Sequence, residues 1–421
     1  MDNTEQKAYK QGRFMYILEA TFEYLLHLLV AGSFLATITG SLGISDSLTG
    51  IISSFISLGC LFQLLSLFLR RKRVKTIVII LSIVNQILFL LLYLIPLWGG
   101  GQHFKTAAFV IAIFSAYIIY NFVHPKKINW FMSLVDDQHR GSFTANKEII
   151  SLISGMIFQF AMGAVFDSFK EKGEIKTAFI IAATVMLVLM AAHTLSMIFT
   201  VEKDIPTPEK KNLLNSIKEI AVNKDILKIT LVFILYNAAN YSSVSFHSTY
   251  HINELGFSLK LISVIAISGS VSRILFSRFW GKYADKYSFA NMIEKCFIIL
   301  GLGYLCYAFA TPKTGLVAVI GYTLLHGIAM GGINSALINL VFDYVTPDKR
   351  SDSLAICQAA SGIVGFTSTL IVSPLVTHIQ KSSNTFLGIP IYAQQVLSIL
   401  SLVLTVIAII YVRTILIKKS K

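Results

Sequence analysis

The residues of this chain with the most capacity for chemistry are charged side chains that interrupt apolar stretches. Three of them recur every four positions in the first stretch: Glu19, Glu23 and His27. This spacing places all three on nearly one face of a helix. Another apolar stretch is interrupted by Lys126 and Lys127. An ionised side chain in hydrocarbon costs about 2.5–3.5 kcal/mol even on lenient insertion scales, so these residues need partners or a water-filled cavity.

The elements that must position these side chains are transmembrane helices. Hydrophobic residues make up 55% of the 421 residues and charged residues only 14%, whereas a water-soluble protein carries about 25% charge. Each apolar stretch can cross about 30 Å of hydrocarbon as a helix of about 20 residues. We place twelve of them, at residues 14–37, 47–69, 75–97, 105–135, 142–166, 177–200, 226–249, 257–278, 288–310, 315–343, 352–380 and 391–417. The predicted fold class is an all-α polytopic membrane protein.

The basic residues indicate the orientation of these helices. With both termini in the cytoplasm, the inner segments hold 23 Lys and Arg residues and the outer segments hold 7, in agreement with the positive-inside rule. The net charge of +14 therefore lies in short loops, where it favours contact with anionic membrane lipid over nucleic acid. We expect a multi-pass protein of the cytoplasmic (inner) membrane, and the Lys-, Ile- and Asn-rich composition is typical of a low-GC bacterium.

Motifs for hydrolytic or redox chemistry are absent from the sequence. It has no GxxxxGK[ST] phosphate loop, no HExxH and no Gly-x-Ser-x-Gly, so ATP-driven transport is disfavoured. The four cysteines lie within apolar stretches at unrelated spacings, which is typical of core residues rather than metal ligands. We therefore expect a protein that is not an enzyme and has no cofactor and no metal.

The chain divides into two halves around one long polar segment, 201–225, with six apolar stretches on each side. We assign an N-terminal six-helix bundle to residues 1–200, a cytoplasmic linker with a short amphipathic helix near 213–221 to residues 201–225, and a C-terminal bundle to residues 226–421. Short motifs recur in both halves: Leu42-Gly43-Ile44-Ser45 matches Leu255-Gly256-Phe257-Ser258, and Asn129 precedes Arg140 much as Asn339 precedes Arg350. Such internal similarity is typical of duplicated transporters.

With this topology, the segment Gly281-Lys282-Tyr283-Ala284-Asp285-Lys286 resembles the GxxxDK/R loop of the major facilitator superfamily. The resemblance covers essentially the whole chain. It implies two pseudo-symmetric six-helix bundles that transport by alternating access around a site between them. It also implies a cytoplasmic gate, whose candidate residues are Gly281, Asp285, Lys286, Arg140, Arg350, Glu148 and Arg273. The first-half copy departs from the pattern, because Phe68 and Lys72 stand at the Gly and Asp positions.

The intramembrane charges predict an ion pair. Glu23 and the two lysines lie about ten residues from the cytoplasmic ends of their stretches, so their depths agree at about 1.5 Å per residue. We predict that Glu23 pairs with Lys126 or Lys127, across the cavity that the first and fourth helices line in the superfamily. Two other interpretations stay open: a purely structural pair, or a fourth helix that ends early and places the lysines at the interface.

The predicted solute site combines these charges with amide and phenol groups, which suit hydroxyl-rich or zwitterionic solutes. Hydrogen bonds between helices are the alternative role for such groups. The predicted substrate-binding residues are Glu23, Lys126, Lys127, Asn129, Trp130, Tyr236, Asn237, Asn240, Tyr241 and Asn334, and the predicted proton-coupling residues are Glu19, Glu23 and His27.

These observations predict a monomeric secondary transporter that imports a small polar solute, such as a sugar or an organic anion. We expect proton coupling, with sodium as the alternative ion. Export of an amphiphilic or drug-like compound is the second hypothesis, and a non-transporting membrane sensor is the third.

Overall fold

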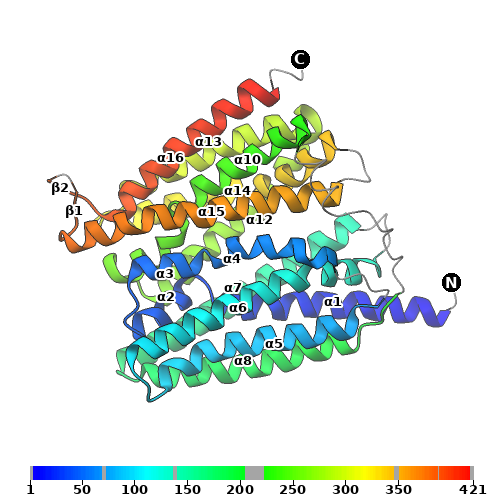
Figure 1. Cartoon of the computed structure of the whole chain (residues 1–421), viewed down its shortest axis with the longest axis horizontal. Helices are drawn as coiled ribbons and strands as arrows, with labels where there is room; N and C mark the ends of the chain where they lie inside the picture. The colour runs from blue at the N-terminus through cyan, green and yellow to red at the C-terminus, as the bar shows by residue number, and fades with distance from the viewer. Residues whose placement is uncertain are drawn as a thin grey trace. The chain divides into compact units, whose positions relative to one another are not determined.

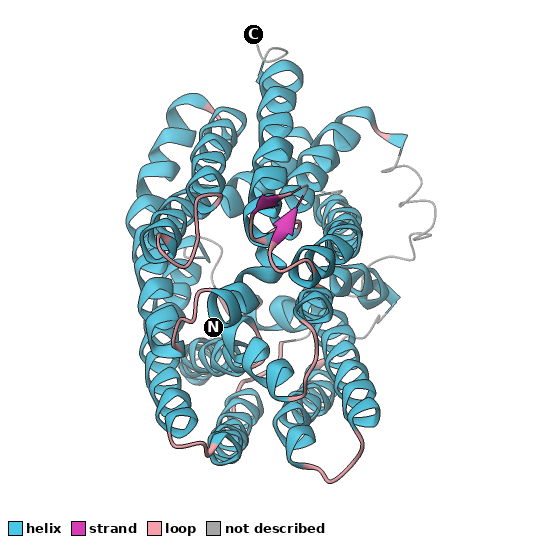
Figure 2. Ribbon diagram, turned by 90° about the vertical axis from the view of Figure 1, so that its left-hand side faces the viewer, coloured by secondary structure: helices cyan, strands magenta, loops and turns pink. Residues whose placement is uncertain are grey.

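The computed structural model describes residues 3–68, 73–135, 140–203, 222–345, 350–386 and 388–417. Within these residues the chain is helical apart from short connections and two antiparallel strands of two residues each, β1 (Thr385–Phe386) and β2 (Ile389–Pro390) (Figure 2). The chain forms two compact units. The first comprises Met1–Ile44, Phe62–Lys210 and Ser258–Ser263, and the second comprises Ser45–Leu61, Lys211–Phe257 and Val264–Lys421. The linker helix predicted near 213–221 lies outside the described residues.

The first unit is a bundle of long helices. In it α1 packs against α7 and α8, and α5 packs against α6 and α8 (Figure 1). Its helices are α1 (Asn3–Leu29), α2 (Gly32–Ser41), η1 (Cys60–Phe68), α5 (Lys75–Leu94), η2 (Ile95–Leu97), α6 (Gln102–Met132), α7 (Arg140–Glu171) and α8 (Ile175–Ile198). Buried Tyr16, Val78, Val123, Trp130 and Met197 form one hydrophobic core, so residues of α1, α5, α6 and α8 meet there.

The second unit is also helical. Here α10 packs against α15 and α16, and α13 packs against α14 and α16. Its helices are α3 (Asp46–Ser53), α4 (Phe55–Gly59), α10 (Lys224–Tyr241), η4 (Val244–Phe246), α11 (His247–Thr249), η5 (Tyr250–Glu254), α12 (Leu259–Tyr287), α13 (Phe289–Tyr307), α14 (Gly315–Tyr344), α15 (Arg350–Lys381), α16 (Ala393–Tyr411) and η7 (Val412–Ile417). The first residues of α12 belong to the first unit.

Eleven segments among the described residues are long and apolar enough to cross a membrane. They correspond to eleven of the twelve predicted spans. The exception is the seventh, predicted at 226–249, because α10 ends at Tyr241 and its first turns carry Lys224, Asp225 and Lys228. The chain then continues through three short helical turns rather than one straight helix. The second span is also interrupted, since α3, α4 and η1 replace a single helix.

The repeated Leu-Gly-x-Ser motif has the same local structure in both halves. Gly43 and Gly256 adopt φ angles of 61° and 68°, a left-handed conformation that glycine tolerates and that ends a helix. Ser45 Oγ then accepts from the Leu48 amide at 3.3 Å at the start of α3. Ser258 Oγ accepts from Leu261 at 3.1 Å at the start of α12. The motif therefore stops one helix and caps the next, so the sequence similarity between the halves has a structural counterpart.

Candidate functional site

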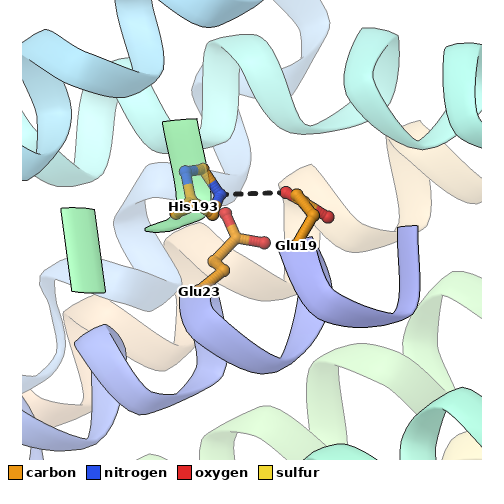
Figure 3. Close-up of side chains that lie close together, drawn as sticks. All are labelled: Glu19, Glu23 and His193. Atoms are coloured by element: carbon orange, nitrogen blue, oxygen red, sulfur yellow. Dashed lines mark hydrogen bonds and ion pairs between the residues drawn. The ribbon is translucent and has the colours of Figure 1, made fainter. Parts of the chain in front are cut away.

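Four helices of the first unit assemble a buried polar cluster: α1, α5, α6 and α8. Glu19 and Glu23 lie one turn apart on α1, and both side chains point toward the same place (Figure 3). Residues four apart share one helix face, and two like charges at that spacing destabilise the helix. The arrangement therefore requires positive or hydrogen-donating groups from the neighbouring helices.

Lys127 of α6 supplies the positive charge. Its Nζ lies 2.7 Å from Glu19 Oε1 and also donates to Glu23 Oε1. The side chains are 2% exposed for Lys127, 1% for Glu19 and 18% for Glu23. The predicted pairing of Glu23 with one of the two lysines is confirmed for Lys127. The alternative of a fourth helix that ends early does not hold, because α6 continues through Pro125 to Met132.

A histidine that the sequence analysis missed completes the cluster. His193 of α8 is fully buried, and its Nε2 lies 3.1 Å from Glu19 Oε1 (Figure 3). On the other side of the ring, Gln86 Nε2 of α5 lies 2.7 Å from His193 Nδ1. An amide nitrogen can only donate, so Nδ1 accepts, and the ring proton of a neutral His193 is on Nε2, where it is donated to Glu19. The signal for both residues was present in the sequence: each is a polar side chain inside an apolar span.

A small cavity adjoins the cluster. Its polar lining includes Glu23, Ser82, Asn85, Gln86, His124 and Lys127. Its volume of about 10 Å³ is about the space that one water molecule requires. Gln86 Oε1 and His124 Nδ1 are buried without a hydrogen-bond partner among the described residues. Because buried polar atoms are normally satisfied by protein or ordered water, we expect a water molecule in this cavity.

His27 lies near the cluster but does not contact its carboxylates. Its Nδ1 lies 2.9 Å from the backbone oxygen of Glu23. Its ring meets the rings of Phe89 and Tyr120 edge-on, at centroid distances of 5.3 and 4.5 Å. Glu19, Glu23 and His27 therefore do lie on one helix, α1, at successive turns, but His27 packs against aromatic rings one turn beyond the acids.

Glu19, Glu23 and His193 present ligand atoms close enough to one another to hold a metal ion. The ammonium group of Lys127 already lies between the two carboxylates, however. A metal ion would have to displace this ammonium and overcome its repulsion, since both would compete for the same oxygens. The donor set as arranged suits an ammonium and a proton better than a resident metal.

The other predicted residues of the first unit differ in their surroundings. Trp130 is fully buried, donates from its indole nitrogen to the Val201 carbonyl at 3.0 Å and stacks on Phe131. Asn129 is exposed and Lys126 is half-buried. The contacts of Trp130 favour a packing role over contact with a solute.

In the second unit, the predicted solute residues lie mainly on α10. Tyr236 is buried, and its hydroxyl donates to Met330 Sδ at 3.2 Å. Asn240 Oδ1 accepts from the Tyr304 hydroxyl at 3.4 Å. Asn237 and Tyr241 are half-buried, and Asn334 of α14 is exposed. Tyr236 and Asn240 thus make the interhelical bonds of the alternative interpretation, while their solute-binding role stays a prediction.

The gate candidates of the second half lie on a continuous helix. The structure extends α12 to Tyr287, so Gly281, Asp285 and Lys286 are helical and exposed rather than part of a loop. A Cβ added at Gly281 would meet no described atom within 4 Å. A close approach between helices occurs instead where α12 meets α14, because a Cβ at Gly327 would fall 2.3 Å from the Gly269 carbonyl oxygen.

The gating role of the remaining candidates stays a prediction. Arg273 lies half-buried on α12, and Glu148 is exposed on α7. The side chains of Arg140 and Arg350 lie outside the described residues.

The sequence matches the Major Facilitator Superfamily over residues 14–369. The chain belongs to the Major Facilitator Superfamily. It is thus a multi-pass membrane protein of a transporter family, as its apolar helices also indicate. No curated protein matches it by sequence.

Solved superfamily transporters share this fold. The nucleoside transporter NupG superposes with a TM-score of 0.69 at 13% identity, covering 96% of this chain and 98% of NupG. A bacterial homologue of the iron transporter ferroportin, in an inward-facing state, superposes with a TM-score of 0.67 at 12% identity, covering 97% of this chain and 100% of the homologue. A bacterial homologue of the human lysosomal transporter Spinster, inward-facing and unoccupied, superposes with a TM-score of 0.66 at 13% identity, covering 98% of this chain and 97% of the homologue. At these identities the likeness shows the fold alone, which is the twelve-helix superfamily fold.

Proposed function

We propose that this protein is a proton-coupled secondary transporter that carries a small polar organic solute, such as a sugar or an organic anion, across the cytoplasmic membrane. The observation that carries the proposal is the buried cluster in which Lys127 bridges Glu19 and Glu23. Ionisable residues inside transmembrane helices are expensive to maintain and mark ion or substrate pathways.

The charge of the cluster supports a coupling role. A buried ion pair is often no more stable than well-packed apolar residues of the same size. Stability alone therefore gives little reason to retain two acids and a lysine in the bundle. Two carboxylates that share one ammonium group form a site whose pairing changes when a proton arrives or leaves. Such a change is the local event that a coupled transporter needs.

The space around the cluster supports a proton rather than an organic solute as its immediate ligand. The adjoining cavity of about 10 Å³ has room for one water molecule. Glu19 and Lys127 are also almost completely buried. A proton can reach them through water, whereas a sugar-sized solute cannot contact them without a rearrangement of the unit.

The solute itself is best identified by ligand-induced stabilisation. Purified protein would be heated with glucose, uridine, succinate, glutamate or tetraphenylphosphonium, and its unfolding temperature recorded. A ligand that binds only the folded protein, at 100 times its Kd, stabilises it by about 2.7 kcal/mol. Stabilisation by one of the polar solutes supports the proposed solute class. Stabilisation by the lipophilic cation alone would favour export of amphiphilic compounds and contradict the proposal.

Coupling is tested in liposomes with the solute that this screen identifies. The wild-type protein should accumulate the solute when a pH gradient is imposed, and a sodium gradient should have no effect. Glu23→Gln should abolish proton-driven accumulation but retain exchange of solute across the membrane, because the variant removes one of the two negative charges that Lys127 bridges and that the coupled proton would balance. The matched control Glu174→Gln changes an exposed acid and should accumulate normally. Unchanged accumulation by Glu23→Gln would remove this residue from the coupling mechanism.

A further inference from the structure

The three side chains in direct contact in the cluster, Glu19, Glu23 and Lys127, carry a net negative charge. Two carboxylates and one ammonium sum to minus one, and Glu19 and Lys127 are 1% and 2% exposed. Two buried carboxylates that share one ammonium are less well compensated than a one-to-one pair, and incomplete compensation of buried charge is unfavourable. The cluster is therefore a site for one additional positive charge.

We propose that His193 takes up this additional proton and is the group that carries the coupled proton, with Glu19 as its counter-ion. The proposal rests on the proton coupling proposed above, but the protonation of His193 can be measured without transport. His193 is the histidine whose ring nitrogen lies within hydrogen-bond distance of a carboxylate of the cluster, at 3.1 Å from Glu19 Oε1. It is also completely buried, so its charge state affects the cluster directly.

Gln86 provides the means to hold His193 in either charge state. In the observed arrangement the Gln86 amide nitrogen donates to Nδ1 at 2.7 Å, which requires a neutral ring with its proton on Nε2. The Gln86 oxygen is buried and has no partner among the described residues. A half-turn of the amide would place this oxygen against Nδ1, where it would accept from a newly protonated nitrogen. The amide nitrogen would then face the water-sized cavity that Gln86 lines.

The step balances in protons and charge. One proton enters from the bulk solvent and is relayed by the water in the cavity, which remains neutral; it binds Nδ1 of His193, Nε2–H continues to donate to Glu19, and the Gln86 amide turns from donor to acceptor. The net charge of the cluster changes from minus one to zero. Glu19 then has two cationic partners and Lys127 is free to pair mainly with Glu23, so the proton changes the contact between α1 and α6.

The charged and titratable groups around His193 come from three helices. They are Glu19, Glu23 and His27 of α1, His124 and Lys127 of α6, and Lys147 of α7. Lys147 contacts the ring of Tyr16, 4.7 Å from its centroid, and its Nζ lies 3.3 Å from the Tyr16 hydroxyl. His27 bonds to a backbone oxygen rather than to a carboxylate. His193 differs from these groups because it combines a carboxylate partner, Glu19, with an amide partner, Gln86, that can act as donor or acceptor.

The test is nitrogen-15 NMR of full-length protein labelled at its nine histidines, in detergent micelles over a range of pH. The His193 signals are those that disappear in His193→Asn. At high pH they should show a neutral ring with the proton on Nε2, and on acidification they should change to those of an imidazolium. In Glu19→Gln the imidazolium form should be lost over the same pH range. The matched control His103→Asn removes an exposed histidine and should leave the His193 signals unchanged.

Three results would overturn the proposal. His193 could stay neutral at every pH at which the protein remains folded, its neutral form could carry the proton on Nδ1, or Glu19→Gln could titrate like the wild type. In liposomes, His193→Asn should lose proton-driven accumulation and retain exchange. A wild-type protein without proton-driven accumulation would refute the coupling, and with it the transport role of His193. Failure confined to the NMR experiment would refute the assignment to His193 and leave the proposed function intact.

Discussion

Replacement of Lys127 by methionine tests whether the buried cluster is balanced as the structure indicates. The substitution keeps the length and volume of the side chain but removes the charge that bridges Glu19 and Glu23. Removing one partner of a buried ion pair typically costs about 3–5 kcal/mol, because the remaining charge is left uncompensated. Here two carboxylates lose their shared cation, and Glu19 keeps only the hydrogen bond from His193. We expect a loss of about 3–5 kcal/mol from the free energy of unfolding, which is a large part of the stability of a typical domain.

The magnitude is measured by unfolding in SDS, followed by tryptophan fluorescence. Trp130 is buried in the same unit and bonded to the Val201 carbonyl, so in a background with Trp98 and Trp280 replaced by Phe its emission reports the unfolding of that unit. The control Lys105→Met removes a half-buried lysine whose ammonium contacts only the Pro96 carbonyl, at 3.5 Å, among the described residues. It should change stability by less than about 0.5 kcal/mol.

A triple variant separates the charge from the packing. Glu19→Gln, Glu23→Gln and Lys127→Met together remove every formal charge of the cluster while they approximately preserve its volume. Since apolar or neutral replacement of a whole buried ion network is often neutral or stabilising, the triple variant should recover most of the stability lost in Lys127→Met. A single variant that loses less than about 1 kcal/mol, or a triple variant as unstable as the single, would refute the electrostatic reasoning.

Three further predictions concern the rest of the molecule. Asp167→Ala should lower the stability by about 1 kcal/mol in the same unfolding assay, because both carboxylate oxygens cap the first amides of α12 at 2.9 and 2.7 Å. Gly50→Ala should cost about 1–3 kcal/mol, since the new Cβ would fall 2.1 Å from an atom of the Phe246 ring. Stability should also fall as the pH drops from about 6.5 to 4, by up to about 3 kcal/mol. Burial lowers the pKa of His251, whose Nε2 lies 2.6 Å from the Tyr307 hydroxyl, to about 4, so the folded protein binds fewer protons than the unfolded one.

Each of these three predictions has a matched control. Glu171→Ala removes an exposed acid of the same helix as Asp167, and equal losses for the two variants would argue against the capping role. Gly99→Ala places a Cβ where no described atom lies within 4 Å, so it should be tolerated. His251→Asn should flatten the pH dependence; a slope that persists in this variant would assign the acid sensitivity to other groups.

The sequence by itself determined the membrane architecture and the existence of an intramembrane ion pair. Hydrocarbon solvates neither peptide groups nor charges. Long apolar stretches therefore indicate transmembrane helices, basic loops indicate the cytoplasmic side, and isolated intramembrane charges indicate that a partner lies nearby. Depth along two spans was sufficient to match Glu23 with a lysine of the fourth span. The Leu-Gly-x-Ser repeat was likewise readable, because its glycine and serine act on the adjacent backbone.

Only the tertiary structure decided which side chains meet. Lys126 and Lys127 are adjacent in sequence but about 100° apart around a helix, so the rotation of α6 determined that Lys127 bridges the acids. His193 lies 174 residues from Glu19 in sequence, and Gln86 lies 107 residues from His193. No local pattern links three helices that far apart. Trp130 shows the same limit: its position suggested a cavity, whereas packing placed it in the core of its unit with its indole nitrogen on a backbone carbonyl.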